Sequence, residues 1–148
     1  TGVIVNAIGN IENLPNKAKK ALNDVITQTK DNSKIIMTLA LSYGSREEIV
    51  NAIKNISKKV VNKELSLKEI DEIIINNHLY TFNLAEVDVM IRTCGEQRIS
   101  KFLLWQMAYA ELYFTGVLWP DFRKEHLVEA IHNYQDRERR FGKTSEQL

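Results

Sequence analysis

The apolar run at residues 35–41, IIMTLAL, constrains the fold of this chain more than any other segment. Because it is almost continuously apolar, it has the pattern of a parallel strand that is buried on both faces. A second apolar run, Val3–Ile8, ends at Gly9 and is also predicted to be a buried strand. Between the two runs, apolar residues recur at helical spacing after Pro15, which suits the first turn of a helix.

Three later segments also show helical spacing of apolar residues. Ser45 and Glu48 have the spacing of a capping box at the start of the first segment, and Ser66 and Glu69 repeat that spacing at the second. The third is predicted to begin at about Lys124. The first segment carries lysines mostly off its apolar face, which indicates a solvated helix surface. These lysines are Lys54, Lys58, Lys59 and Lys63.

Strands are further predicted at residues 88–92 and 112–114. Strands that alternate with helices predict an α/β fold with a mainly parallel sheet flanked by helices. The length of 148 residues suits a single domain over residues 1–148. In such sheets, ligands bind beyond the carboxyl ends of the strands. Two charged loops, residues 43–46 and 92–100, follow predicted strands there.

Composition excludes several functional classes. The net charge of +1 argues against a nucleic-acid-binding surface, so anion recognition must come from a local cluster. One cysteine, Cys94, excludes an intrachain disulfide and a Cys-rich zinc site, and it fits a cytoplasmic protein. The start of the chain lacks the pattern of a signal peptide. Because Thr1 leads directly into a strand, the chain is predicted to be a fragment or a processed product.

The most apolar stretch, residues 102–119, is interrupted by Gln106 and Glu111. It is close to the lower limit of a membrane span, which needs roughly 20 apolar residues. A buried helix followed by a short strand is the better interpretation. Ser100 is predicted to cap that helix, which would run through Trp105 and Tyr109.

The loop at residues 92–100 concentrates groups that bind anions. Arg92 and Arg98 flank Gly95, which allows a tight turn, and Ser100 adds a hydroxyl at the predicted helix start. Guanidinium groups match phosphate oxygens in pairs, so the set suits a diphosphate better than a carboxylate. Glu96 would orient an arginine or contact a metal held by the diphosphate. An ordinary loop with a surface Arg–Glu pair and a serine cap explains the spacing equally well.

Glu111 is a carboxylate in apolar surroundings, which is costly unless it is paired or binds a metal. It is either a magnesium or substrate ligand or the partner of a structural arginine, and the sequence slightly favours the second interpretation. The loop at residues 43–46 has two interpretations as well. It faces a phosphate through Arg46, or it is a tight turn before a capped helix.

The sequence from His78 to Phe122, HLYTFNLAEVDVMIRTCGEQRISKFLLWQMAYAELYFTGVLWPDF, closely resembles the signature of the cis-prenyltransferases, the undecaprenyl diphosphate synthase family. VIVNAIGNIENLP resembles the strand and turn that lead to the family's "LP". LALSYGSREEI resembles its "NYGGR-x-E-I" motif, and NYQDRERRFGK resembles its "RERRFGG" ending. The resemblance covers essentially the whole chain.

The resemblance implies an undecaprenyl diphosphate synthase-like fold and a Mg²⁺-dependent enzyme. Such an enzyme condenses isopentenyl diphosphate onto an allylic diphosphate, such as farnesyl diphosphate, with cis stereochemistry. The product is a long polyprenyl diphosphate that becomes the lipid carrier for cell-wall sugars. The resemblance also implies a homodimer and a peripheral membrane contact through the lipid product.

The resemblance assigns roles to individual residues. Arg92, Arg98 and Ser100 match the positions that hold isopentenyl diphosphate, and Glu96 matches an acidic position beside them. Glu111 matches the acidic position that is linked to Mg²⁺ and catalysis.

Further positions lie outside that loop. Arg46 matches the arginine of "NYGGR", although Ser42 and Ser45 replace the usual Asn and Gly around it. Arg140 and Gly142 match an R-x-G element that reaches the diphosphate site of the neighbouring subunit in family dimers. Three residues match the strand that helps to line the product tunnel. They are Ile35, Met37 and Leu39.

The family's catalytic Asp motif, D-G-N-x-R-W, does not occur in this sequence. The chain is therefore expected to be a C-terminal portion of the catalytic domain, with the N-terminal part absent, and to be inactive alone. One alternative is a non-catalytic partner subunit, but such a subunit would be expected to lose Arg92, Arg98 and Ser100. Another is a phosphate-binding module with a different ligand, which leaves the long signature unexplained.

Overall fold

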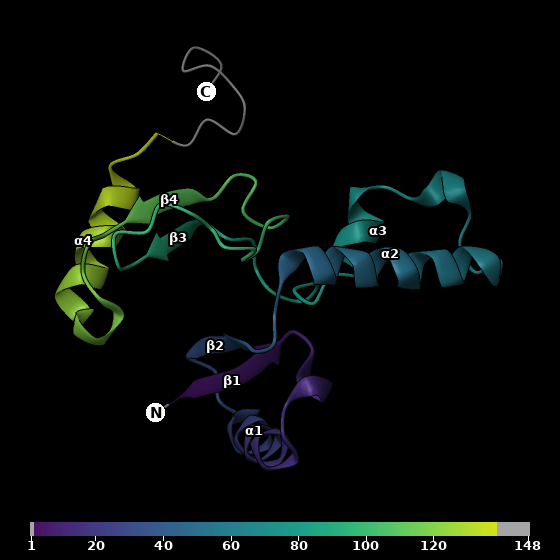
Figure 1. Cartoon of the computed structure of the whole chain (residues 1–148), viewed down its shortest axis with the longest axis horizontal. Coiled ribbons are helices and arrows are strands. Elements are labelled where there is room, and N and C mark those ends of the chain that lie inside the picture. Colours follow the sequence, from purple (N-terminus) through teal and green to yellow (C-terminus); the bar gives the residue numbers. More distant parts are fainter. Residues whose placement is uncertain (1, 139–148) are drawn as a thin grey trace. The chain divides into compact units, whose positions relative to one another are not determined.

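The computed structural model describes residues 2–138 of the chain (Figure 1). The chain divides into two compact units, Thr1–Leu84 and Ala85–Leu148, and each is described by itself. Both units contain a pair of parallel strands and at least one helix. The predicted α/β class with parallel strands flanked by helices is therefore confirmed. The single domain over residues 1–148 stays a prediction.

The first unit begins with a βαβ arrangement. Strands β1 (Val3–Ile8) and β2 (Ile35–Ala40) are parallel, with Val3 opposite Ile35 and Ile8 opposite Ala40. Helix α1 (Asn16–Thr29) connects them and packs on β1. The Oγ1 of Thr29 accepts the backbone N–H of Val5 at 3.0 Å, which fixes the end of α1 against the strand.

The second half of this unit is helical. It contains α2 (Ser45–Val61), a 3-10 turn (Leu67–Glu69) and α3 (Glu72–Asn76). The predicted capping box of Ser66 and Glu69 is confirmed, but it caps the 3-10 turn. Asp71 caps α3 instead, because its Oδ1 accepts the N–H of Ile74 at 2.8 Å. The lysines predicted to be solvated are all exposed.

The capping box predicted for Ser45 and Glu48 is wrong. Ser45 is the first helical residue of α2, and the cap position is held by Gly44, which has no side chain to offer. Glu48 is buried and bonds to tyrosines instead of the helix start. The carboxylate therefore serves tertiary structure rather than the end of the helix.

The second unit holds β3 (Val89–Arg92), β4 (Glu111–Phe114), a 3-10 turn (Trp119–Asp121) and α4 (Lys124–Gln135). The strands are parallel, with Val89 opposite Glu111 and Arg92 opposite Phe114. Helix α4 packs beside β4 (Figure 1). Ala130 of α4 and Met90 of β3 are buried. The predicted strands are confirmed to within a residue, and the terminal helix begins at the predicted Lys124.

The helix predicted to begin at Ser100 is wrong. Residues 100–109 form a series of turns, and no helix lies between β3 and β4 in the described chain. Ser100, Lys101 and Leu103 have φ angles of +49°, +62° and +45°. A right-handed helix needs negative φ at every residue, so these three positions interrupt it.

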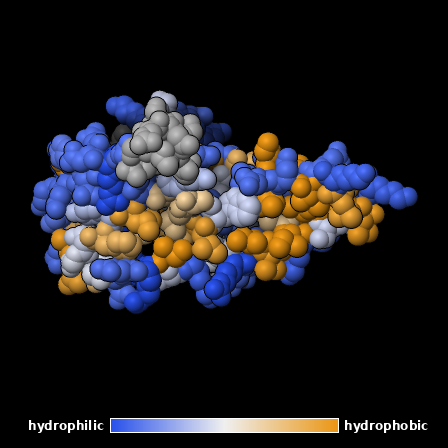
Figure 2. Space-filling view, turned by 90° about the horizontal axis from the view of Figure 1, so that it is seen from above, coloured by the Kyte–Doolittle hydropathy of each residue, from blue (hydrophilic) through white to orange (hydrophobic). Residues whose placement is uncertain are grey.

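Strand β2 is less buried than predicted. Ile35, Ile36 and Met37 are 60%, 58% and 46% exposed. The physical reason is that β2 pairs with β1 alone among the described residues, while α1 packs on β1. Figure 2 shows that apolar side chains reach the surface in patches on one face of the molecule. None of the described helices is long and apolar enough to cross a membrane.

Candidate diphosphate site

Arg92 is the last residue of β3, so it lies at the carboxyl end of the parallel pair. Its Nε is buried and has no hydrogen-bond partner among the described residues. A buried donor that is left unpaired costs about 1–3 kcal/mol. The unmet donor at this position can therefore bond to an acceptor from outside the described chain, such as a phosphate oxygen or a water molecule.

The backbone beyond Arg92 is fixed to the loop that follows β4. Cys94 donates its N–H to the carbonyl of Val117 and Gly95 to that of Thr115, both at 2.9 Å. Thr115 in turn donates its N–H to the carbonyl of Arg92 at 2.9 Å. Cys94 and Gly95 turn the chain with φ angles of +67° and +69°. The two loops together form an ordered base at this edge of the sheet.

Glu96 and Arg98 form an ion pair on the same loop. Their side chains are 32% and 67% exposed, so the Arg98 guanidinium reaches solvent while Glu96 is partly covered. This ion pair is compatible with both interpretations of the loop. It is an Arg–Glu pair of the kind found on ordinary loops, and it also lets Glu96 orient Arg98. The unmet Nε of Arg92 is the observation that favours an anion site over an ordinary surface pair.

Ser100 does not lie at a helix N-terminus, which corrects the expectation from the sequence. It is exposed and has a left-handed φ of +49° in a series of turns. No helix begins at Ser100 in the described chain. The free N–H groups and the positive dipole end that were expected beside its hydroxyl are therefore missing. On the loop after β3, Arg92 and Arg98 are therefore the remaining candidates for binding an anion.

Glu111 lies at the other end of the strand pair. It begins β4 opposite Val89, three positions before the level of Arg92, which corresponds to roughly 10 Å along the strand. Its Oε2 accepts a hydrogen bond from Nη1 of Arg137 at 2.8 Å. The arginine pairing that the sequence favoured is thus present, and the strands do not bring Glu111 beside Arg92.

The fit of Glu111 to magnesium depends on its second oxygen. Arg137 takes Oε2, and no hydrogen bond joins Oε1 to any described residue. Among residues 2–138 there is no group of three or more acidic, histidine or cysteine side chains that could hold a metal. Mg²⁺ often uses only one or two carboxylates and completes its shell with water and phosphate oxygens. Glu111 fits as a single protein ligand of that kind.

Arg46 lies in the first turn of α2, which follows the short loop after the carboxyl end of β2, and it is exposed. Tyr43, three residues earlier, donates its hydroxyl to the buried Glu48 at 2.6 Å. Arg46 belongs to the first unit and Arg92 to the second. Each of the two predicted loops therefore occupies the expected strand end within its own unit.

The sequence matches the prenyltransferase family described as undecaprenyl diphosphate synthase over residues 1–142. The chain belongs to this family. It is 45% identical over 140 residues to the isoprenyl transferase of Clostridium tetani, covering 95% of this chain and 55% of that protein. It is 46% identical over 139 residues to a Thermoplasma volcanium protein named tritrans,polycis-undecaprenyl-diphosphate synthase (geranylgeranyl-diphosphate specific), covering 94% and 54%.

The fold of this prenyltransferase family member resembles a solved relative closely. The crystal structure of lavandulyl diphosphate synthase from Lavandula x intermedia, in complex with dimethylallyl diphosphate, aligns with a TM-score of 0.91 at 38% identity. That alignment covers 95% of this chain and 61% of the lavender chain. The chain thus spans about half the length of the curated relatives it matches.

The predicted tunnel residues of this prenyltransferase chain lie on alternate positions of β2, so they share one face of the strand. Ile35 and Met37 on that face are exposed and Leu39 is half-buried. They form an open apolar surface rather than a closed tunnel in the described chain. Arg140 and Gly142 lie outside the described residues.

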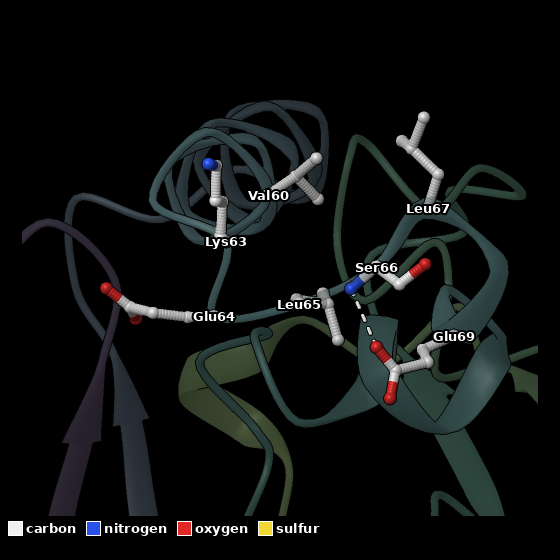
Figure 3. Close-up of a pocket in the computed structure, with 7 residues that line it drawn as sticks. All are labelled: Val60, Lys63, Glu64, Leu65, Ser66, Leu67 and Glu69. Carbon is white, nitrogen blue, oxygen red and sulfur yellow. Dashed lines mark hydrogen bonds between the residues drawn. The ribbon is translucent and has the colours of Figure 1, made fainter.

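A surface pocket of about 410 Å³ lies in the first unit, at the end of α2 (Figure 3). Figure 3 shows the hydrogen bond from Ser66 to Glu69, and Val60, Leu65 and Leu67 supply most of the apolar lining. None of the predicted site residues lines this pocket. It is therefore separate from the candidate diphosphate site.

Sequence reasoning missed three residues that hold candidate site residues or their loops. Glu48 and Tyr80 anchor the loop before α2, and Arg137 binds Glu111. Arg137 lies in the stretch that resembled "RERRFGG", so the motif pointed to it without giving its partner. The partners Tyr80 and Glu48 are far apart in sequence, and no local spacing could have joined them.

Tyr113 of β4 was also missed. Burial raises the pKa of Tyr113, and the hydrogen bond and negative charge of Glu129 on α4 raise it further. Tyr113 therefore stays neutral near pH 7, at the place where α4 packs against β4.

Proposed function

We propose that this chain forms the isopentenyl diphosphate half of a prenyltransferase that elongates an allylic diphosphate to a long polyprenyl diphosphate. The observation that carries the proposal is the buried, unpaired Nε of Arg92 at the carboxyl end of β3. Arg98 on the same loop supplies a second guanidinium. The match to the undecaprenyl diphosphate synthase family over residues 1–142 supports a diphosphate as the anion.

The proposed chemistry is electrostatic. Arg92 and Arg98 bind the diphosphate through charge-assisted hydrogen bonds, which are roughly twice as strong as neutral ones. Glu96 holds Arg98 through the ion pair and limits the positions that its guanidinium can occupy. Fixed positive charge at the diphosphate stabilises the negative charge that the substrate brings without reorganisation during the reaction. Ser100 remains a proposed contact through its exposed hydroxyl. Arg46, in the first turn of α2, is likewise a proposed diphosphate contact through its exposed side chain.

We assign Mg²⁺ to Glu111 as its protein ligand. The carboxylate is held by Arg137 through one oxygen, which leaves Oε1 to face a metal. When bound, the ion supplies positive charge that assists departure of a diphosphate. Arg137 keeps the Glu111 side chain in one orientation, so the ligand is preorganised.

The allylic substrate and the stereochemistry are also part of the proposal. We propose farnesyl diphosphate as the starter and cis double bonds in the product. The word "polycis" in the name of the Thermoplasma volcanium relative supports cis addition. That relative is named for geranylgeranyl diphosphate, and the lavender enzyme was crystallised with dimethylallyl diphosphate. The apolar face of β2 is proposed to form one wall of the product tunnel.

We further propose a cytoplasmic homodimer in which Arg140 and Gly142 reach the diphosphate site of the neighbouring subunit. Membrane contact would come through the lipid product, which would serve as a carrier for cell-wall sugars. A non-catalytic partner subunit is the less favoured alternative, because Arg92 and Arg98 are both retained.

The first test compares residues 1–148 with a chimera in which the N-terminal part of the Clostridium tetani isoprenyl transferase precedes them. Incorporation of labelled isopentenyl diphosphate onto farnesyl diphosphate is measured with and without Mg²⁺. We expect no product from residues 1–148 alone and Mg²⁺-dependent product from the chimera. Turnover by residues 1–148 alone would contradict the expected inactivity, and an inactive but folded chimera would favour the partner-subunit alternative.

The second test uses Arg98→Ala in the chimera. Because Arg98 would donate charge-assisted bonds, its loss should raise the KM for isopentenyl diphosphate by about 10-fold or more. Lys58→Ala removes one positive charge from the exposed surface of α2 and serves as the matched control. An unchanged KM in Arg98→Ala would remove Arg98 from the site.

A further inference from the structure

Glu48 is a carboxylate in the interior of the first unit, with 1% of its surface exposed. Its Oε2 accepts the hydroxyl proton of Tyr43 at 2.6 Å, and its Oε1 accepts the backbone N–H of Tyr80 at 2.8 Å. Burying a carboxylate is costly unless strong donors satisfy it. The nearby N-terminus of α2 lowers that cost further, because its positive dipole end favours negative charge.

Tyr80 is itself held in place. Its hydroxyl accepts a hydrogen bond from Nδ2 of Asn51 at 2.7 Å, one turn further along α2. The rings of Tyr43 and Tyr80 meet edge to face, with centroids 6.4 Å apart. Glu48 therefore joins the loop after β2, the first turns of α2 and the segment after α3.

The backbone that carries Arg46 is fixed on both sides. Tyr43 is bonded to Glu48 on one side, and the N–H of Glu48 bonds to the carbonyl of Gly44 at 2.9 Å. The preceding residue, Ser42, accepts the N–H of Asn10 at 3.2 Å. Arg46 is the exposed, charged side chain of this otherwise anchored turn.

We propose that Glu48 is a positioning residue, whose buried carboxylate fixes the loop at residues 43–46 so that Arg46 is presented to a substrate diphosphate. This inference rests on the proposed function, because it takes Arg46 as a diphosphate contact. Glu48 acts through Tyr43 and the loop backbone. The long side chain of Arg46 loses less freedom on binding when its backbone is already ordered.

The test measures binding of inorganic pyrophosphate to the ¹⁵N-labelled chain of residues 1–148. The dissociation constant is taken from the amide shifts of Gly44 and Ser45, which belong to the loop that carries Arg46. Glu48→Ala would leave the partly buried donors of Tyr43 and Tyr80 without this acceptor, and unfolding would obscure the result. Tyr43→Phe is therefore the main variant, because it removes one hydroxyl and leaves Glu48 bonded to Tyr80.

We expect Arg46→Ala to weaken binding by about 10-fold or more and Tyr43→Phe to weaken it by about 3- to 10-fold. If Tyr43 and Glu48 act through Arg46, the double variant binds no more weakly than Arg46→Ala, because the two effects share one cause. Tyr80→Phe is the matched control. It removes the bond from Asn51, keeps both bonds to Glu48, and should lower the melting temperature without changing pyrophosphate binding.

Two results would overturn the inference and are distinguishable. If Arg46→Ala weakens binding but Tyr43→Phe only lowers the melting temperature, or if the two effects multiply in the double variant, Glu48 is merely structural. If Arg46→Ala leaves the dissociation constant unchanged, Arg46 is not a diphosphate contact and that part of the proposed function fails as well.

Discussion

At Gly9, a single added methyl group should strongly lower the stability of the fold. Its φ is +109°, and a Cβ built there would lie 2.1 Å from the carbonyl oxygen of Leu41. Because real Cβ atoms essentially never approach closer than 3.0 Å, the ends of β1 and β2 would have to separate by 0.9 Å. That movement strains the bond from Leu41 to Ile8 and the bond from Asn10 to Ser42.

The cost of Gly9→Ala follows from these contacts. An unfavourable φ costs about 1–3 kcal/mol, and each weakened hydrogen bond about 1 kcal/mol, so the free energy of unfolding should fall by roughly 3–5 kcal/mol. For a chain of this size the melting temperature would drop by about 10 °C. Because Ser42 directly precedes the loop that carries Arg46, pyrophosphate binding, measured from the amide shift of Gly44, should weaken as well.

Gly95→Ala is the matched control for this prediction. Gly95 also has a positive φ, +69°, but nothing lies within 4 Å of a Cβ built there. Only the left-handed conformation is penalised, which costs about 1–2 kcal/mol. Thermal unfolding followed by far-UV circular dichroism compares the two variants. Equal melting temperatures for Gly9→Ala and Gly95→Ala would refute the contact argument, since the two would then share a purely conformational cost.

Three further predictions concern the second unit. Cys94 is an exposed thiol two residues after Arg92, so pyrophosphate with Mg²⁺ should slow its alkylation, and equal rates with and without ligand would contradict a site there. Arg137→Ala should lower the free energy of unfolding by less than about 1 kcal/mol, because its pair with Glu111 is partly exposed. The same variant should weaken Mg²⁺ binding measured calorimetrically with pyrophosphate, because Arg137 holds Glu111 in one orientation, and unchanged binding would contradict that role. The pKa of Tyr113 in the folded chain is raised above its ordinary value of 10.0. The neutral Tyr113 therefore contributes fully to stability below about pH 10, and this contribution is lost as the pH rises through the folded pKa. Tyr113→Phe should therefore flatten the decline of the melting temperature between about pH 9 and 11, and an unchanged slope would disprove this assignment.

The strands could be predicted because their signal is local. Val3–Ile8 was expected with the bounds that β1 has, and β2 to β4 differ by a residue at one end. Parallel pairing followed from the alternation of strands with helices, which leaves room for crossovers. The burial of β2 could not be predicted in the same way. An apolar sequence shows that a strand can be buried on both faces. Whether it is buried depends on which other elements pack against those faces.

The turns at residues 100–109 show a limit of local propensity. Leu, Gln, Met and Ala in this stretch favour a helix, and Ser100 is a good cap. The structure nevertheless places Ser100, Lys101 and Leu103 at positive φ. Nothing in the local sequence accounts for this conformation. The absence of this helix does not affect the position predicted for Arg92, which depends only on the end of β3. The helix N-terminus predicted beside Ser100 is wrong.

The two Ser-x-x-Glu sequences explain why part of the candidate site was visible and part was not. Ser66 and Glu69 form a capping box, whereas Ser45 and Glu48 have the same spacing and do not. Glu69 is exposed, so the nearest unsatisfied donors are those of its own turn. Glu48 is buried beside donors from residues 5 and 32 positions away, and a buried carboxylate must satisfy those first. Identical local patterns thus diverge through long-range burial, and the residue that departs from the local rule is the one that anchors the loop of Arg46.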